Sequence, residues 1–134
     1  MPLCLSAIGD IICFGHPRTA HDYTAVLYVI ENMQKCSSVE IDFNDSGIRE
    51  DQIRTLTDAL HGKHGKIQVI VLDLNDNKLT DECVTDLFHK ASSAFQSLKE
   101  LYLSVNRIGA ESIKSITTAL AESCSSINLS HNPL

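Results

Sequence analysis

The feature that most constrains this fold is an eight-residue phrase that occurs twice in nearly the same form, LDLNDNKL at 72–79 and LYLSVNRI at 101–108. Both copies carry apolar residues at the first, third and eighth positions and asparagine at the sixth. A segment that repeats at a fixed interval is typical of repeat architectures, in which each unit buries its apolar side against its neighbours. The matching residues are Leu72, Leu74, Asn77 and Leu79 in the first copy and Leu101, Leu103, Asn106 and Ile108 in the second.

Two further copies extend the repeat in both directions, IDFNDSGI at 41–48 and INLSHNPL at 127–134. The four copies begin at positions 41, 72, 101 and 127, so their spacings are 31, 29 and 26 residues. The earliest of them has Ser46 where the others have asparagine. We also expect a fainter copy that begins at Ile12, with Phe14 as its second apolar position.

Between the phrases, apolar residues recur at the spacing of a helix face. Acidic residues open each clear helix, where we expect them to complement the positive end of that helix's own dipole. Each unit is therefore predicted to be a short strand, a turn, a helix and a return loop. The apolar stripes are Ile53, Leu56 and Leu60; Val84, Leu87 and Ala91; Ile113, Ile116 and Leu120; and Tyr23, Val26, Leu27 and Ile30. The acidic residues are Glu50, Asp51, Asp81, Glu82 and Glu111.

The asparagine of the phrase stands where the chain leaves the strand and turns. Backbone groups inside such a stack of turns have no water to bond to, and an amide side chain can both donate to them and accept from them. We therefore expect Asn77 and Asn106 to be buried and hydrogen-bonded to the backbone. The shorter Ser46 should tie its turn less well.

These residues resemble the leucine-rich repeats, whose pattern is L-x-x-L-x-L-x-x-N-x-L. A unit of about 28 residues with a full helix, as in SLKELYLSVNRIGAESIKSITTAL, is similar to the ribonuclease-inhibitor-like subclass, which also occurs in intracellular immune receptors and bacterial effectors. The resemblance covers 39–134 well and 10–38 weakly. It implies an α/β right-handed solenoid in a short horseshoe arc, with parallel strands on the concave face and helices on the convex face. The residues that match throughout are Leu98, Leu101, Leu103, Asn106 and Ile108.

At 134 residues the chain is expected to form a single domain. We assign 1–38 to an N-terminal cap with a degenerate repeat, 39–126 to three strand–helix repeats, and 127–134 to the start of a further repeat. Within the cap, two short apolar runs in 2–14 predict a hairpin or an extra edge strand. The final strand has no helix after it, so either the sequence is part of a longer chain or another surface covers this end.

Composition limits the function. With 11 basic and 17 acidic residues the net charge is −6, which argues against nucleic-acid and anionic-membrane partners and favours a basic partner, or only solubility. No stretch is apolar for the roughly 18 residues that a membrane helix needs, and no signal peptide is expected. The five cysteines are odd in number and follow no tight motif, which predicts free thiols in a reducing compartment. We therefore expect a cytoplasmic protein, or one in the host cytosol if it is a secreted bacterial effector.

The candidate binding residues alternate with the buried strand residues. In the resembled family the concave sheet usually binds the partner, so these positions are predicted to contact a protein with a basic surface. Four of them are acidic and none is basic, and Tyr102 is the best anchor because tyrosine is common in binding hot spots. The alternative is a sheet face that is only solvated. The candidates are Glu40, Asp42, Asn44, Val71, Asp73, Asn75, Glu100, Tyr102, Ser104 and Asn128, and Ser126 and Ser130 continue their rows.

No pattern in the chain predicts catalysis, a metal or a cofactor. His61 and His64 have metal-like spacing, but they occupy a glycine-rich loop with no cysteine or carboxylate nearby in sequence. Cys83 lies at a helix start, where the dipole could lower its pKa. No histidine is placed to serve Cys83 as a base, so we predict that the protein is not an enzyme.

The sequence thus predicts a protein–protein interaction module that binds through a concave, acidic sheet face. The alternative is an oligomerisation or structural fragment of a larger leucine-rich-repeat receptor or effector. That alternative uses the uncapped C-terminal edge, through which a homodimer could form. Whether the chain is a host regulator or a pathogen effector is left open.

Overall fold

The computed structural model describes residues 4–8, 11–15, 19–120 and 124–133, and in these ranges the chain is an α/β protein with four α-helices and one open six-stranded sheet. None of these helices combines the length and apolar character that crossing a bilayer requires. The strands are β1 (Cys4–Ile8), β2 (Ile11–Gly15), β3 (Ser37–Asp42), β4 (Ile67–Asp73), β5 (Glu100–Tyr102) and β6 (Ser126–Asn128). The helices are α1 (Ala20–Asn32), α2 (Glu50–His61), α3 (Asp81–Lys90) and α4 (Ala110–Ala119), with a short 3-10 helix η1 (Ser92–Phe95) after α3.

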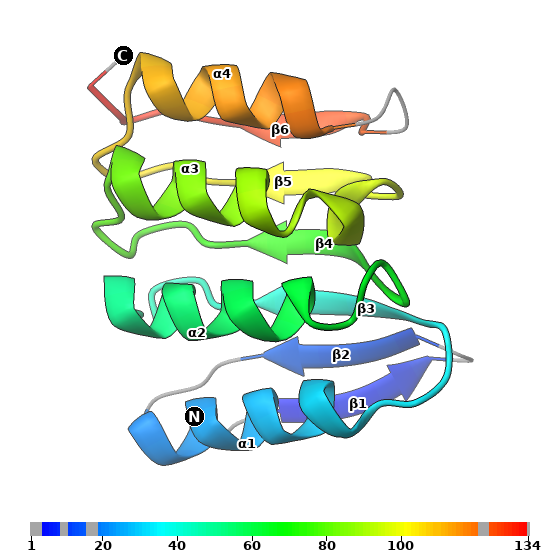
Figure 1. Cartoon of the computed structure of the whole chain (residues 1–134). Helices are drawn as coiled ribbons and strands as arrows, with labels where there is room; N and C mark the ends of the chain where they lie inside the picture. The colour runs from blue at the N-terminus through cyan, green and yellow to red at the C-terminus, as the bar shows by residue number, and fades with distance from the viewer. Residues whose placement is uncertain (1–3, 9–10, 16–18, 121–123, 134) are drawn as a thin grey trace.

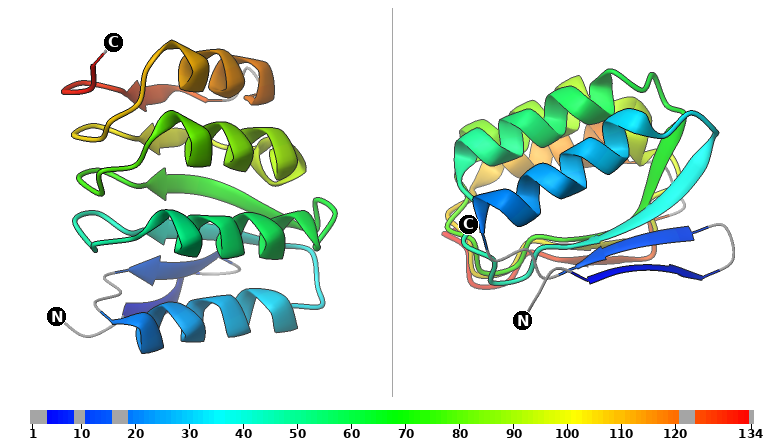
Figure 2. Two further views of the ribbon diagram at one scale, coloured as in Figure 1. Left: turned by 60° about the vertical axis from the view of Figure 1, so that its left-hand side comes forward. Right: turned by 90° about the horizontal axis from the view of Figure 1, so that it is seen from below.

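The strands follow one another across the sheet in chain order (Figure 1). Strands β2 to β6 are parallel, which confirms the predicted parallel sheet, and β1 pairs antiparallel with β2 as the predicted N-terminal hairpin. A helix follows each of β2 to β5 and lies on the same side of the sheet, so the opposite face carries no helix among the described residues (Figure 2). This arrangement leaves one face of the described sheet without a helical layer.

The strand register confirms the alignment of the four phrases. Ile41 pairs with Leu72, Leu72 with Leu101, and Leu101 with Ile127. The alignment of the faint first copy is wrong, because Phe14 and not Ile12 pairs with Ile41. A shift of two residues keeps the same side chains on the same face, so the alternating pattern could not detect the error.

The alternating residues of the four phrases predict strands near 41–44, 72–75, 101–104 and 127–130. The observed strands end about two residues earlier, and β3 and β4 also begin several residues earlier. Hydrogen bonding between neighbouring units nevertheless continues beyond the strand ends. The Phe43 amide donates to the Asp73 carbonyl at 2.8 Å, and the Leu74 amide donates to the Tyr102 carbonyl at 2.8 Å. The predicted segments therefore cover the strand ends and the paired backbone that follows them.

One apolar core lies between the sheet and the helices. The predicted stripes of α2 and α3 are buried, and in α1 Tyr23, Val26 and Ile30 are buried while Leu27 is half-buried. The core thins at the C-terminal end of the sheet. There Ile113 and Leu120 are only half-buried, and Ile127 is 46% exposed.

The asparagines form a ladder through the turns, which confirms their predicted role. Asn77 and Asn106 are 6% and 5% exposed. The Asn106 side-chain oxygen accepts from the Asn77 and Leu79 amides of the preceding turn at 3.2 and 2.9 Å. Its Nδ2 donates to carbonyls of both turns, those of Leu74 at 2.9 Å and Leu103 at 3.1 Å. Each amide thus joins two units and not only its own turn.

Asn77 and Asn132 repeat this arrangement one unit earlier and one unit later. Asn77 Oδ1 accepts from the Ser46 and Ile48 amides, both at 3.2 Å. Asn132 Oδ1 accepts from the Asn106 and Ile108 amides at 3.1 and 3.2 Å. Leu134, the last apolar position of the final phrase, lies outside the described residues.

The acidic residues at the helix starts have a role that the sequence did not predict. Asp81 Oδ1 accepts from the amides of Gly109 and Ser112 at 2.7 and 3.2 Å, and from Ser112 Oγ at 2.5 Å. Asp81 opens α3, whereas Gly109 and Ser112 belong to the start of α4. The Asp81 carboxylate therefore caps the start of α4 in the next unit, while it also lies in the first turn of its own helix, α3. Glu50 of α2 accepts a comparable bond from Thr80, the residue before α3.

Candidate partner-binding face

The predicted binding residues on the strands form two rows across the open side of the sheet. In the first row Glu40 pairs with Val71 and Val71 with Glu100. In the second row Asp42 pairs with Asp73, Asp73 with Tyr102, and Tyr102 with Asn128. The strand residues between them, such as Ile41, Leu72 and Leu101, are buried against the helices. The alternation of the sequence therefore places these candidates on one face. We call Glu40, Asp42, Asp73 and Glu100 the acidic face.

A hollow of about 370 Å³ lies over these rows. The N-terminal hairpin contributes one wall of it, a part of the chain that the sequence analysis did not assign to the site. The repeat pattern is weakest there, and only the parallel pairing of β2 with β3 brings these residues alongside. The hairpin residues are Cys13, Phe14 and Gly15, and the remaining lining residues are Glu40, Ile41, Asp42, Val71, Asp73 and Glu100.

Within the described ranges, no lysine or arginine occupies an outward position of β2 to β6. The ion pairs that the described residues form lie on the helix side: Arg49 with Asp51, Arg54 with Glu82, and Lys90 with Asp58. The four carboxylates of the acidic face are half-buried. They therefore form a negative surface that no cation in this part of the chain neutralises.

The chain's own backbone holds Asp42 and Asp73 in place. Asp42 Oδ1 accepts from the Asn44 amide at 3.1 Å, and Asp73 Oδ1 accepts from the Asn75 amide at 3.0 Å. The pKa of Asp73 is raised, chiefly because burial disfavours the charged carboxylate and also because the Asp42 carboxylate repels it. The hydrogen bond from the Asn75 amide opposes this rise only in part. Asp73 thus bears mainly the cost of burial, with a smaller contribution from a like charge on the neighbouring strand.

The predicted anchor, Tyr102, is half-buried, and its hydroxyl is already engaged. It donates to Glu100 Oε1 at 3.0 Å, and this bond raises the pKa of the phenol. Cys13 Sγ donates to Glu40 Oε2 at 3.1 Å in the same way. Both contacts fix carboxylates on the face, so Tyr102 offers its ring and not a free hydroxyl to a partner.

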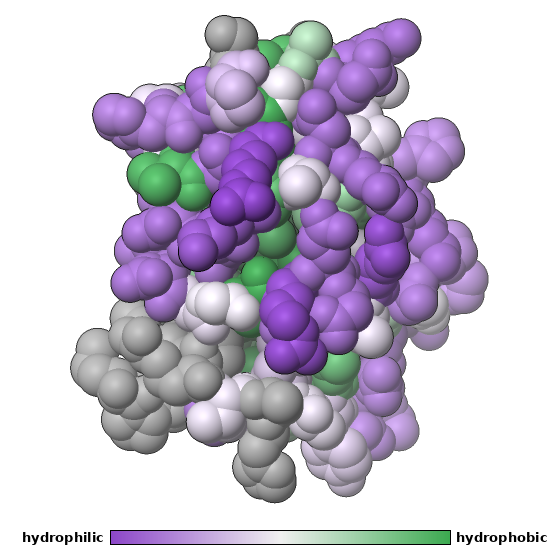
Figure 3. All heavy atoms as spheres, turned by 90° about the vertical axis from the view of Figure 1, so that its left-hand side faces the viewer, coloured by the Kyte–Doolittle hydropathy of each residue, from purple (hydrophilic) through white to green (hydrophobic). Residues whose placement is uncertain are grey.

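The candidates at the turns differ in exposure. Asn44 and Asn128 are exposed, whereas Ser104 is only 8% exposed. Asn75 Oδ1 accepts from both the amide and the hydroxyl of Ser104, at 2.6 and 2.8 Å. This pair therefore serves the turn itself. Hydrophilic side chains cover most of the turn edge of the molecule (Figure 3).

The residues considered for metal binding or catalysis do not form a reactive centre in the described part of the chain. His61 Nδ1 lies 3.0 Å from the Lys90 carbonyl, and no group of three or more His, Cys, Asp or Glu side chains there could hold a metal. Cys83 is fully buried, and burial raises the pKa of its thiol. The lowering that its helix-start position suggested is therefore wrong, because desolvation outweighs the dipole.

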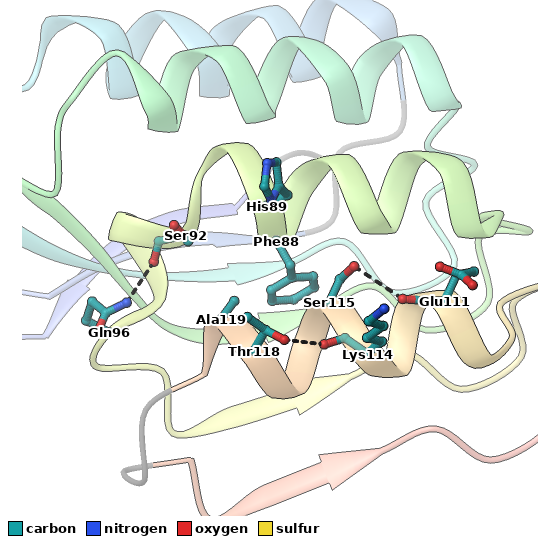
Figure 4. Close-up of a pocket in the computed structure, with 9 residues that line it drawn as sticks. All are labelled: Phe88, His89, Ser92, Gln96, Glu111, Lys114, Ser115, Thr118 and Ala119. Carbon is teal, nitrogen blue, oxygen red and sulfur yellow. Dashed lines mark hydrogen bonds between the residues drawn. The ribbon is translucent and has the colours of Figure 1, made fainter.

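A second hollow, of about 450 Å³, lies between α3 and α4 on the helix side (Figure 4). Phe88 from α3 and Lys114 and Glu111 from α4 are among the residues that line it. Its hydroxyls are used within their own helix, since Ser115 Oγ donates to the Glu111 carbonyl at 3.2 Å and Thr118 Oγ1 to that of Lys114 at 2.8 Å. Opposite charges line this hollow, so it lacks the single sign of the acidic face.

No family model, curated protein or solved structure matches this chain. The geometry and charge of the residues themselves therefore carry the argument for a function.

Proposed function

We propose that this protein is a protein-interaction module whose acidic face binds a basic surface of its partner. The observation that carries the proposal is the set of four half-buried carboxylates on neighbouring strands, with no described lysine or arginine at the outward positions. A basic partner would relieve the repulsion between Asp42 and Asp73. Complementary charge also speeds encounter and selects among partners.

We further propose that the chain is a leucine-rich-repeat solenoid of the ribonuclease-inhibitor-like subclass, right-handed and curved with the sheet on its concave side. Three features support this proposal: strands in chain order, helices on one side only, and the asparagine ladder. In such a stack the open sheet is the natural binding surface, because the helices use their inner faces for the core. The asparagine ladder is the feature that an unrelated parallel α/β sheet does not require.

Binding rather than catalysis agrees with the side-chain chemistry. The thiol of Cys83 is buried in its neutral form, and His61 is held by a backbone carbonyl. Of the five cysteines, the four whose side chains are described are not joined in disulfides. This observation supports a reducing compartment such as the cytosol, either of the organism that makes the protein or of a host.

A charge-reversal experiment tests the binding face. A variant with Asp42→Lys, Asp73→Lys and Glu100→Lys should bind a labelled poly-arginine peptide at least several-fold more weakly than the wild type, with a flatter dependence on salt. A control with Glu31→Lys, Asp76→Lys and Glu111→Lys has the same net charge but leaves the face intact. Equal binding by the face variant and the wild type would contradict the proposal, provided that thermal melting shows both to be folded.

A second candidate function is self-association through the C-terminal edge of the sheet. The exposure of Ile127, together with the half-buried Ile113 and Leu120, favours it. Strand β6 pairs with β5 on one side and with no described strand on the other, and unpaired strand edges can pair with another chain. A polar helix added after Leu134 should lower the solution mass from dimer to monomer if this edge associates. A mass that the added helix does not change would contradict this second candidate.

A further inference from the structure

We infer that uptake of one proton by the Asp42–Asp73 pair weakens the attraction of the acidic face for basic partners. The inference rests on the proposed function, since it names how binding at that same face is regulated. The proton comes from solvent, and the face loses one negative charge when the pair takes it up. No bond between heavy atoms changes.

The geometry of the pair carries the inference. Asp42 and Asp73 are direct partners on parallel strands, which lie about 4.8 Å apart in a sheet. Each carboxylate is fastened to its own backbone, Asp42 by the Asn44 amide and Asp73 by the Asn75 amide. These bonds hold both carboxylates at the ends of neighbouring strands. The repulsion is therefore built into the sheet, and a proton relieves it.

The groups around the pair offer it no positive charge. Strand β3 contributes Glu40 beside Asp42, and β5 contributes Glu100 and Tyr102. The Tyr102 hydroxyl donates to Glu100 and not to Asp73. On β2 the partner of Asp42 is Gly15, which has no side chain, and Cys13 donates to Glu40.

The lysine nearest to Asp73 in sequence, Lys78, lies on the turn after β4 and lines a separate hollow with Arg107. Lys66 and Lys99 precede β4 and β5, whereas Asp73 is the last residue of β4. They therefore lie at the opposite end of these strands. Among the described residues no cation forms an ion pair with either carboxylate, so a proton or a cation supplied by a partner can neutralise the pair. A basic partner and a proton compete for the same charge.

This competition gives binding and folding opposite pH dependence. Burial and Asp42 raise the pKa of Asp73 in the folded protein above its unfolded value. The ionised Asp73 therefore opposes folding, and this penalty disappears as the pH falls through the folded pKa. Binding of a cation favours the ionised form, so affinity falls over the same pH window. Acid unfolding would instead weaken stability and binding together.

The test joins two measurements on the full chain. NMR follows the side-chain carboxyl carbon of Asp73 from neutral into acidic pH, and fluorescence anisotropy follows binding of the labelled poly-arginine peptide. We expect the peptide affinity to fall with the same midpoint as the Asp73 titration. Asp42→Asn should move both midpoints to lower pH, because it removes the repulsion and keeps an oxygen that can accept from the Asn44 amide. Asp76→Asn, on the exposed turn, removes one charge elsewhere and should leave both midpoints unchanged.

The outcomes separate the two proposals. An Asp73 midpoint that Asp42→Asn does not lower would overturn the proton switch, and so would peptide binding that is independent of pH through that midpoint. Absence of peptide binding at every pH, with a folded spectrum, would overturn the proposed function and leave the switch without a partner to regulate. If the midpoints of the Asp73 titration and of peptide binding coincide, and Asp42→Asn shifts them together, the result supports both proposals.

Discussion

The turn after β4 and the turn after β3 occupy equivalent places in the fold, but their side chains hold them differently. Asn77 makes five hydrogen bonds to backbone atoms of two units. Ser46 at the equivalent place donates only to the carbonyl of Asn44, within its own turn, at 3.2 Å. The Asn77 amide therefore connects two units, whereas the Ser46 hydroxyl occupies the same position without making this connection.

Removing the amide from the middle of the ladder should have the largest effect. Asn106→Leu leaves the amides of Asn77 and Leu79 without their buried acceptor, each unsatisfied group costing about 1–3 kcal/mol. We expect a loss of about 1–3 kcal/mol in the free energy of unfolding, measured by urea denaturation. The matched variant Ser46→Leu should cost less, because Ser46 accepts no bond from another unit in the described structure. Equal losses of stability in the two variants would contradict the proposed difference between the two turns.

The residue just before the asparagine, or before Ser46 in the first turn, adopts the left-handed conformation in each of the four turns. Asp45, Asp76 and His131 hold φ values of 46°, 59° and 56°, and Val105 holds 55°. That region costs ordinary residues about 1–2 kcal/mol, and β-branched side chains fit it poorly, whereas asparagine tolerates it. Val105→Asn should therefore raise the free energy of unfolding by about 1 kcal/mol, measured by urea denaturation. A loss of stability would show that Val105 packs usefully despite its 45% exposure.

Asp81 also connects two units, on the helix side of the sheet, and the stability that it contributes depends on pH. Its bonds from Ser112 and Gly109 lower its pKa, so the ionised carboxylate stabilises the fold above its unfolded pKa. This stability is lost as the pH falls through the folded pKa. Asp81→Ala should cost about 1 kcal/mol at neutral pH, as for a lost helix cap, and progressively less in acid.

A matched control for that prediction is Glu82→Ala, which removes a neighbouring exposed carboxylate that pairs with Arg54. Surface pairs of this kind contribute less than about 1 kcal/mol. Thermal melting of both variants across the acidic range gives the comparison. A difference between Asp81→Ala and the wild type that persists at low pH would contradict the ionic origin of the cap.

The smallest expected effect converts the weaker turn into the stronger kind. Ser46→Asn should place an amide next to the carbonyls of Phe43 and Asn44, as Asn106 does with Leu103 and Ser104. The carbonyl of Leu74 already accepts from two asparagines, so the Phe43 carbonyl can accept a second bond. We expect a gain of about 0.5–1 kcal/mol in urea denaturation. Ser46→Ala, the control, should change stability by less than about 0.5 kcal/mol.

Much of the fold could be predicted because the local signals are periodic. Alternation in the phrases placed Ile41, Leu72 and Leu101 in the core, and helical spacing did the same for Ile53 and its equivalents. The register of the first unit could not be predicted, since Ile12 and Phe14 lie on the same face of the strand. The same alternation found Asp42 and Asp73 on the open face, but it could not predict the low exposure of Ser104, whose hydroxyl donates to Asn75 of the preceding unit.

The parallel α/β order, the buried asparagines and the negative sign of the open face follow from the sequence, because each depends on residue type at a regular interval. Only the tertiary structure decided which distant groups meet. It brought Asp81 to the start of α4, placed Cys13 against Glu40, and set Asp42 beside Asp73 so that one carboxyl perturbs the other. These contacts join units about 30 residues apart, and no periodicity within one unit specifies how two units align.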